Sequence, residues 1–128
     1  MSRQNISSGG LWESRYGYSR AVRIGSRIVI AGTIAAGPDG RIECPDDAGA
    51  QTGLIIDRIR EALDQAGAGL EAIILLRIYI TSMEDAESVG LIIKQRLKDI
   101  RPAATMVTVA NLFAGARVEI EAEALMDS

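Results

Sequence analysis

The middle of the chain limits the fold more than any other part of the sequence. Over residues 46–66 the apolar side chains recur every three or four positions, which is the spacing of an amphipathic helix with one buried face. The run that follows at 73–80 is apolar on both faces apart from Arg77 and Tyr79. Such a run is typical of an interior strand that is covered on both sides. The helix and the strand together predict a layered α/β arrangement.

Further strands and a second helix flank this unit. Alternating or β-branched residues predict strands at 18–24, 27–34, 105–109 and 118–124. Ser82, followed by Asp85 in a capping box, predicts a helix that runs to about residue 99. Gly32 interrupts the second strand and indicates a β-bulge or a close backbone approach. The order strand, strand, helix, strand, helix, strand, strand defines an α+β sheet layered with two helices.

The length of the chain fits a single domain. It has 128 residues, and one domain takes roughly 100–200. Residues 1–15 are polar and rich in Gly and Ser, and they are interpreted as an N-terminal arm. Hydrophobic residues make up 48% of the sequence, so part of the apolar surface is expected to meet another subunit. No segment reads as a signal peptide or a membrane span, which predicts a cytoplasmic protein without a membrane partner.

Charge and histidine content exclude several classes of function. The formal net charge is −3 and no run of basic residues is present, which disfavours a nucleic-acid partner. The chain contains no histidine. This removes imidazole as a general base and as a metal ligand, so proton transfer falls to a carboxylate, Tyr, Lys, Cys or water. The sequence from Gly67 to Ala72 matches a dinucleotide-binding pattern, but it leaves a helix and enters a strand, which is the reverse of the required order.

Three carboxylates stand on one face of the last predicted strand. Glu119, Glu121 and Glu123 alternate with Ile120, Ala122 and Ala124. Two interpretations remain open. The face is either a solvated edge, or one glutamate lies in a cleft as an acid or base whose pKa is raised by burial or by its neighbours.

Arginine outnumbers lysine twelve to two, a bias that favours planar recognition of carboxylates or pairing at interfaces. Arg20 and Tyr18 share a face of the first predicted strand, where they could clamp a small carboxylate. The alternative is that Arg20 covers apolar surface or pairs with an acid at an interface. Arg77 lies in the most apolar strand and is expected to be paired structurally, because an unpaired charge there would be costly.

Several short segments carry a resemblance in their order and spacing. They are Tyr18–Val22, Ala31–Thr33, Arg101–Ala103 and Val118–Ala122. Together they resemble the YjgF/Rid family, the reactive intermediate deaminases, also called the endoribonuclease L-PSP family. The match runs from about Tyr18 to Leu125.

The resemblance implies a chorismate-mutase-like α+β fold with two helices on one face of the sheet. It also implies a homotrimer whose sheets form an inner β-barrel, with a cleft between each pair of subunits. Active members of the family hydrolyse 2-imino acids or their enamine tautomers to 2-keto acids and ammonia, and they use neither a metal nor a cofactor. A small-molecule ligand is therefore the expected partner, and a carboxylate is one candidate.

By position, the tyrosine of the family's cleft corresponds to Tyr18. The small Ser-Gly step that approaches the ligand corresponds to Ala31-Gly32, and the glutamate that positions water corresponds to Glu119. Glu121 is the second glutamate of the closing motif.

One departure matters. Active deaminases have an arginine after the Pro-Ala pair, which binds the substrate carboxylate, whereas this chain has Ala104. The sequence thus resembles a divergent branch that lacks this anchor. Either the protein binds a small metabolite with 2-imino acid deamination weak or absent, or it is a C=N hydrolase that uses Glu119 with Arg20 or Arg101 as a substitute anchor. Ribonuclease activity is disfavoured by the net charge and the missing histidine.

Overall fold

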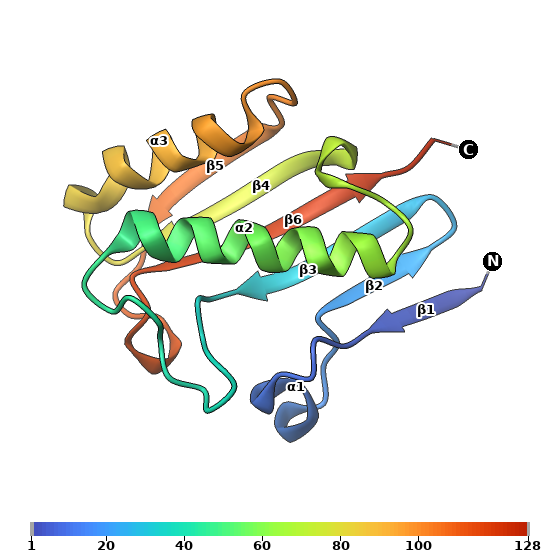
Figure 1. The fold of residues 1–128 in the computed structure, drawn as a ribbon, viewed down its shortest axis with the longest axis horizontal. Coiled ribbons are helices and arrows are strands. Elements are labelled where there is room, and N and C mark those ends of the chain that lie inside the picture. The colour runs from blue at the N-terminus through green and yellow to red at the C-terminus, as the bar shows by residue number, and fades with distance from the viewer. Residues whose placement is uncertain (1, 128) are drawn as a thin grey trace.

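Six strands form one mixed sheet. The computed structural model describes residues 2–127. The sheet has the order β1-β2-β3-β6-β4-β5 (Figure 1). Every neighbouring pair is antiparallel except β4 and β5, which run parallel. The strands are β1 (Arg3–Ile6), β2 (Ala21–Ile24), β3 (Arg27–Thr33), β4 (Ile73–Ile80), β5 (Ala103–Thr108) and β6 (Val118–Leu125).

Two long helices lie on the same face of the sheet (Figure 1). They are α2 (Ala48–Gln65) and α3 (Ala86–Leu97). The Asp47 side chain caps α2 by accepting a hydrogen bond from the Ala50 backbone N–H at 2.9 Å. Ser82 caps a short 3₁₀ turn, Met83–Asp85, and α3 starts only after it. The predicted α+β, chorismate-mutase-like fold with two helices on one face is confirmed.

The core lies between the helices and the sheet. Isoleucines, most of them from α2, β3, β4 and β6, are its most numerous side chains, followed by alanines. Along β6 the residues Val118, Ile120, Ala122 and Ala124 are buried, and the intervening glutamates face the opposite side. The prediction that residues 73–80 are covered on both sides is wrong for the single chain, because Ile74 is 51% exposed and Arg77 is also exposed. Only the helix side of β4 is covered within one chain.

The first fifteen residues, interpreted from the sequence as an arm, contain β1 and most of α1 (Leu11–Tyr16). β1 extends the sheet by pairing with β2, and its Ile6 side chain is buried. α1 ends at Gly17, whose φ of 74° lies in the left-handed region that glycine adopts without strain. Sequence periodicity missed both elements because each is too short to show a repeating pattern. A 3₁₀ turn, η1 (Leu70–Ala72), precedes β4, and another, η3 (Phe113–Gly115), precedes β6.

Candidate functional site

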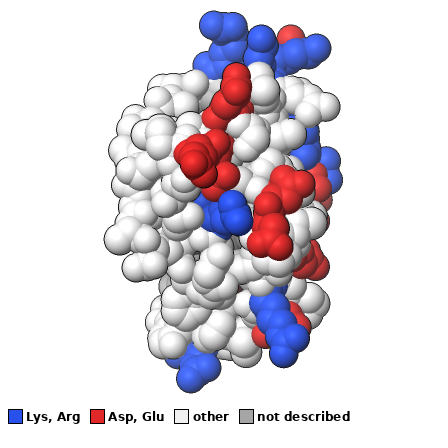
Figure 2. All heavy atoms as spheres, turned by 90° about the vertical axis from the view of Figure 1, so that its left-hand side faces the viewer, with Lys and Arg blue, Asp and Glu red and all other residues white. Residues whose placement is uncertain are grey.

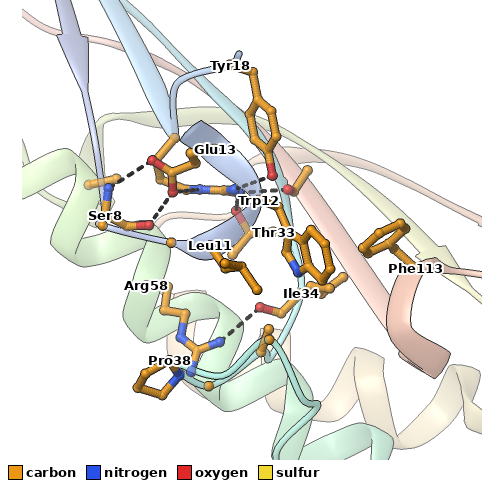
Figure 3. Close-up of a pocket in the computed structure, with 18 of the residues that line it drawn as sticks. Ser8, Leu11, Trp12, Glu13, Tyr18, Thr33, Ile34, Pro38, Arg58 and Phe113 are labelled. Atoms are coloured by element: carbon orange, nitrogen blue, oxygen red, sulfur yellow. Dashed lines mark hydrogen bonds and ion pairs between the residues drawn. The ribbon is translucent and has the colours of Figure 1, made fainter. Parts of the chain in front are cut away.

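A cavity of about 490 Å³ lies beside the N-terminal end of β6 (Figure 3). Its walls come from α1, the end of β3, the loop around Pro38, one side of α2 and Phe113 of η3. Of the residues singled out from the sequence, Tyr18, Arg20, Gly32 and Glu119 line it. Segments that are distant in the sequence therefore meet around one hollow of ligand size.

Glu119 is the titratable group that the cavity places in the most unusual surroundings. The side chain is half-buried, and burial raises the pKa of its carboxyl above the ordinary value. The charge of Arg20 opposes this rise, and the nearby charge of Glu121 adds to it. A half-buried carboxyl of raised pKa is suited to exchange protons with water or a bound ligand, because it holds its proton at higher pH than an ordinary glutamate does.

Gly32 makes room for Glu119. The pairing of β3 with β6 shifts its register between Ile30 and Thr33, so the predicted bulge is present. A Cβ atom on Gly32 would lie 2.8 Å from Oε2 of Glu119 and 2.9 Å from its Cδ. The predicted close approach at Gly32 is thus an approach to the glutamate side chain.

Arg20 is held by acceptors of its own chain. Its Nε donates to Oε2 of Glu13 at 3.3 Å, and its Nη1 donates to the Gly32 carbonyl at 2.7 Å and to Oγ1 of Thr33 at 2.9 Å. Nη2 donates to the Tyr18 hydroxyl at 3.3 Å. These four bonds leave one of the five guanidinium N–H groups for a ligand. β2 begins only at Ala21, but Tyr18 and Arg20 still lie together, with the guanidinium 5.5 Å from the ring centroid.

Glu13 is the buried partner of Arg20. Its side chain is 6% exposed and also accepts hydrogen bonds from the hydroxyl groups of Ser7 and Ser8 and from the Ser8 backbone N–H. Burial alone would raise the pKa of the Glu13 carboxyl, but the bonds from Ser8 and the charge of Arg20 outweigh it and lower the pKa. The ion pair thus fixes α1 and the segment before β2 against the end of β3.

Arg58 of α2 is the second arginine that lines the cavity among the described residues. Its Nη1 donates to the Ile34 carbonyl at 3.0 Å (Figure 3), and its Nη2 pairs with Oε2 of Glu43 at 3.0 Å. Two of its five N–H groups thus donate to the chain, and its charge is paired with that of Glu43. Sequence analysis did not single out Arg58, because on a helix it reads as an ordinary surface arginine.

The structure places the remaining predicted site residues outside the lining of the cavity. Ala31 lies in β3, where its backbone N–H donates to the Arg20 carbonyl at 2.9 Å. Glu121 accepts a hydrogen bond from the Tyr79 hydroxyl at 2.5 Å, and this bond raises the pKa of the Tyr79 hydroxyl. Ala104 is exposed on the edge strand β5, and β4 separates that strand from β6.

The interpretation of the glutamate row as a solvated edge is wrong, because β6 lies between β3 and β4 in the sheet. Glu123 forms ion pairs with Arg27 at 2.8 Å and with Arg77 at 3.1 Å, whereas Glu119 lines the cavity. The expected structural pairing of Arg77 is confirmed by the second of these contacts.

Aromatic side chains form a part of the cavity that sequence analysis missed. Trp12 and Tyr16 come from α1 and Phe113 comes from η3, about a hundred positions later. The Trp12 and Phe113 rings meet edge to face, with centroids 4.6 Å apart and planes at 84° (Figure 3). These contacts join segments that are far apart in the chain, so no local pattern in the sequence indicates them.

Charged groups elsewhere indicate no second site. No three His, Cys, Asp or Glu side chains within residues 2–127 are grouped so that they could hold a metal ion. Among the described side chains drawn in Figure 2, acidic and basic groups are interspersed and the basic ones form no continuous surface. None of the helices between residues 2 and 127 has the length and apolar character needed to cross a membrane.

Comparison with known proteins gives consistent matches along the chain. A family model described as Endoribonuclease L-PSP matches residues 12–126. The crystal structure of a YjgF/YER057c/UK114 family member from Mycobacterium tuberculosis is 44% identical, has a TM-score of 0.88, and is matched over 98% of this chain and 100% of that one. Escherichia coli TdcF, solved with bound serine, is 25% identical with a TM-score of 0.85, over 97% and 99% of the two chains. The human 2-iminobutanoate/2-iminopropanoate deaminase is 29% identical over 108 residues, which cover 84% of this chain and 79% of that protein.

The six-stranded sheet with two helices on one face, together with these matches, defines a chorismate-mutase-like α+β protein. The chain belongs to the YjgF/Rid family, whose model is the Endoribonuclease L-PSP model.

Proposed function

We propose that this protein binds small imines, or enamines that tautomerise to imines, in the cavity and hydrolyses the C=N bond of the imine, and that 2-imino acids are poor substrates. The observation that carries the proposal is the half-buried Glu119 carboxyl of raised pKa against Gly32, in a cavity whose lining arginines, Arg20 and Arg58, form ion pairs with Glu13 and Glu43. The deaminase activity in the name of the human relative and the serine bound to TdcF support a small metabolite as ligand.

The chemistry assigned to Glu119 is proton transfer to and from water. As the oxygen of a water molecule bonds to the imine carbon, the Glu119 carboxylate accepts a proton from that water and passes it to the imine nitrogen, so the carboxylate is ionised again. The resulting carbinolamine then gives its hydroxyl proton through Glu119 to the nitrogen, and ammonia leaves as the carbonyl forms. The overall change is R₂C=NH + H₂O → R₂C=O + NH₃. A raised pKa suits both directions of transfer, because the carboxyl then exchanges protons closer to neutral pH.

The positions of the arginines explain why a carboxylate should bind poorly. A bidentate clamp needs two parallel N–H groups, and Arg20 has only one that does not already contact an acceptor of the chain. Arg20 could serve as a substitute anchor only if its hydrogen bond to the Tyr18 hydroxyl were broken. Arg101 is exposed and lies outside the lining of the cavity, and Ala104 supplies no charge.

The assembly we propose is a homotrimer, as the family resemblance implies. The face of the sheet opposite the helices carries apolar side chains that one chain leaves uncovered. Val29 and Val107 are each 42% exposed on this face, and Leu75 is half-buried there. Packing three such faces together would cover these residues and would bring the β5 strand of one subunit toward the cavity of another.

The test compares two imines made in situ. An amine oxidase acting on butylamine supplies a neutral imine, and an L-amino acid oxidase acting on 2-aminobutyrate supplies 2-iminobutyrate. Semicarbazide traps each imine, so a hydrolase lowers the initial rate of semicarbazone formation. We expect a clear decrease for the neutral imine, little for 2-iminobutyrate, and none with Glu119→Gln. Glu87→Gln, at an exposed position of α3, is the matched control.

Efficient turnover of 2-iminobutyrate would overturn the substrate preference and favour Arg20 as the anchor. Binding without turnover of either imine would make the protein a binder that has lost the chemistry.

A further inference from the structure

The aromatic cluster of Trp12, Tyr16 and Phe113 presents an unusual amount of open ring surface. Phe113 is 51% exposed and Tyr16 is 60% exposed. The two rings from α1 lie nearly parallel, with centroids 6.0 Å apart, and Phe113 meets both of them edge to face. Three rings from distant segments are thus arranged in one geometry, although solvent covers much of their surface.

The cluster is continuous with the cavity that contains Glu119. All three rings line it, and Leu11, 45% exposed, and Pro38 extend the apolar wall (Figure 3). Cluster and glutamate therefore contact the same volume of about 490 Å³. A four-carbon imino acid has seven non-hydrogen atoms and takes roughly 200 Å³, if each atom is given the ~30 Å³ of a liquid water. More than half of the cavity would stay unfilled by such a ligand.

Charge at the aromatic end points to a neutral group. The charge of Arg58 is balanced by its ion pair with Glu43, and its Nη1 also donates to the Ile34 carbonyl. The guanidinium of Arg15 lies 5.6 Å from the centroid of Trp12 and 5.7 Å from that of Tyr16, so it is placed against the ring faces. The aromatic end of the cavity therefore presents the edges and faces of its rings to a ligand. An aromatic ring of the ligand can pack on them in offset or edge-to-face geometry.

Building on the proposed function, we infer that the protein selects imines that carry an aromatic ring, which packs on Trp12 and Phe113 while the C=N group meets Glu119. The ring takes no part in the reaction. For an arylalkyl aldimine the change is R–CH=NH + H₂O → R–CHO + NH₃, with the proton transfers assigned above to Glu119. The cluster acts as the specificity determinant and the glutamate as the reacting group.

Binding of stable neutral amides tests this inference without turnover. Phenylacetamide and propanamide carry a planar amide in place of the C=N group, and only the first has a ring. Trp12 is the one tryptophan of the chain, so its fluorescence reports a ring that packs against it, and calorimetry gives the affinity. We expect phenylacetamide to bind at least ten-fold more tightly than propanamide and to change the Trp12 emission.

Variants at Phe113 distinguish a requirement for an aromatic ring at this position from a requirement for apolar surface. Phe113→Ala should abolish the ten-fold preference, and Phe113→Tyr, which keeps a ring, should restore it. Leu91→Ala removes an equally exposed apolar side chain, 57% exposed on α3 and outside the cavity lining, and should leave the preference unchanged. Sedimentation of each variant shows whether its assembly state is that of the parent.

The outcomes distinguish the inference from the proposed function. Equal affinity for the two amides, together with Glu119-dependent hydrolysis of the butylamine-derived imine, overturns the aromatic preference and leaves the proposed function standing. Absence of any Glu119-dependent hydrolysis with either aromatic or aliphatic imines overturns the proposed function, while a ring preference in binding would still support the subsite. Dissociation of the assembly by Phe113→Ala would identify the cluster as a subunit contact and overturn the inference.

Discussion

Gly32→Ala should separate activity from stability. The new Cβ would lie 2.8 Å from Oε2 of Glu119, and ordinary contact begins at 3.4 Å, so the carboxylate has to retreat by about 0.6 Å. Gly32 is not among the residues with positive φ, so alanine is compatible with its backbone. The substitution therefore acts mainly on the position of the glutamate.

The magnitudes of the two effects differ. A displacement of about 1 Å at a reacting group costs on the order of a hundred-fold in rate, so a shift near 0.6 Å should lower Glu119-dependent hydrolysis by roughly ten- to a hundred-fold. Stability should change little. The atoms that must move belong to the end of a flexible side chain, and alanine in place of glycine at a compatible site stabilises by about 0.4–1 kcal/mol through the unfolded chain.

The assay is the semicarbazide competition with the butylamine-derived imine, together with the midpoint of thermal unfolding. Gly90→Ala on α3 is the matched control, because a Cβ there meets no atom within 4 Å. The control should keep full activity and gain about 0.5–1 kcal/mol of stability, since alanine favours the helix. Full activity of Gly32→Ala, or a loss of stability above about 3 kcal/mol, would refute the reasoning.

Three further predictions follow from the contacts described above. Sedimentation equilibrium should give a homotrimer of the 13.7 kDa chain, and Leu75→Asp, on the open face of the sheet, should reduce it to monomers. Glu13→Gln should cost about 3 kcal/mol at neutral pH, as is usual when one partner of a buried pair is removed. Folding lowers the pKa of the Glu13 carboxyl, so this group stabilises the fold at pH values above its pKa in the unfolded chain, near 4.5. The stabilisation is lost as the pH falls through the lower pKa of the folded state. The stabilities of parent and variant should therefore converge in acid unfolding curves. Ala104→Arg should gain 2-iminobutyrate hydrolysis in the trapping assay, and Ala104→Arg/Glu119→Ala should lose it again.

Residues with a regular period were predictable because each element buries one face. The stripe of α2 and the alternation of β6 are visible in the sequence, and the structure confirms both elements. Gly32 was also predictable, because a glycine inside a β-branched strand marks a bulge or a close approach. α1 and β1 were not, because α1 has only six residues between two glycines and β1 buries a single side chain, Ile6.

Part of the lining of the cavity was predictable, from the alternation that paired Arg20 with Tyr18 and from positions that the resemblance named. Tyr18, Gly32 and Glu119 line the cavity, as the family pattern implies. The ion pair of Glu13 with Arg20 could not be anticipated, because a contact between a residue of α1 and the residue before β2 leaves no periodic pattern in the sequence. The same holds for contacts such as that of Phe113 with α1, which arise from tertiary packing alone.

The position of Glu119 on β6 has a consequence for how the protein can change over evolution. β6 lies between β3 and β4, and the residues that flank Glu119 on it are fully buried, so this part of the chain tolerates little substitution. Phe113 and Ala104 lie instead on an exposed turn and on the edge strand, where most substitutions alter stability by less than about 0.5 kcal/mol. Under the proposed function, single substitutions at these peripheral positions change ligand preference while the Glu119 carboxylate stays in place, so one inherited scaffold can serve different small substrates.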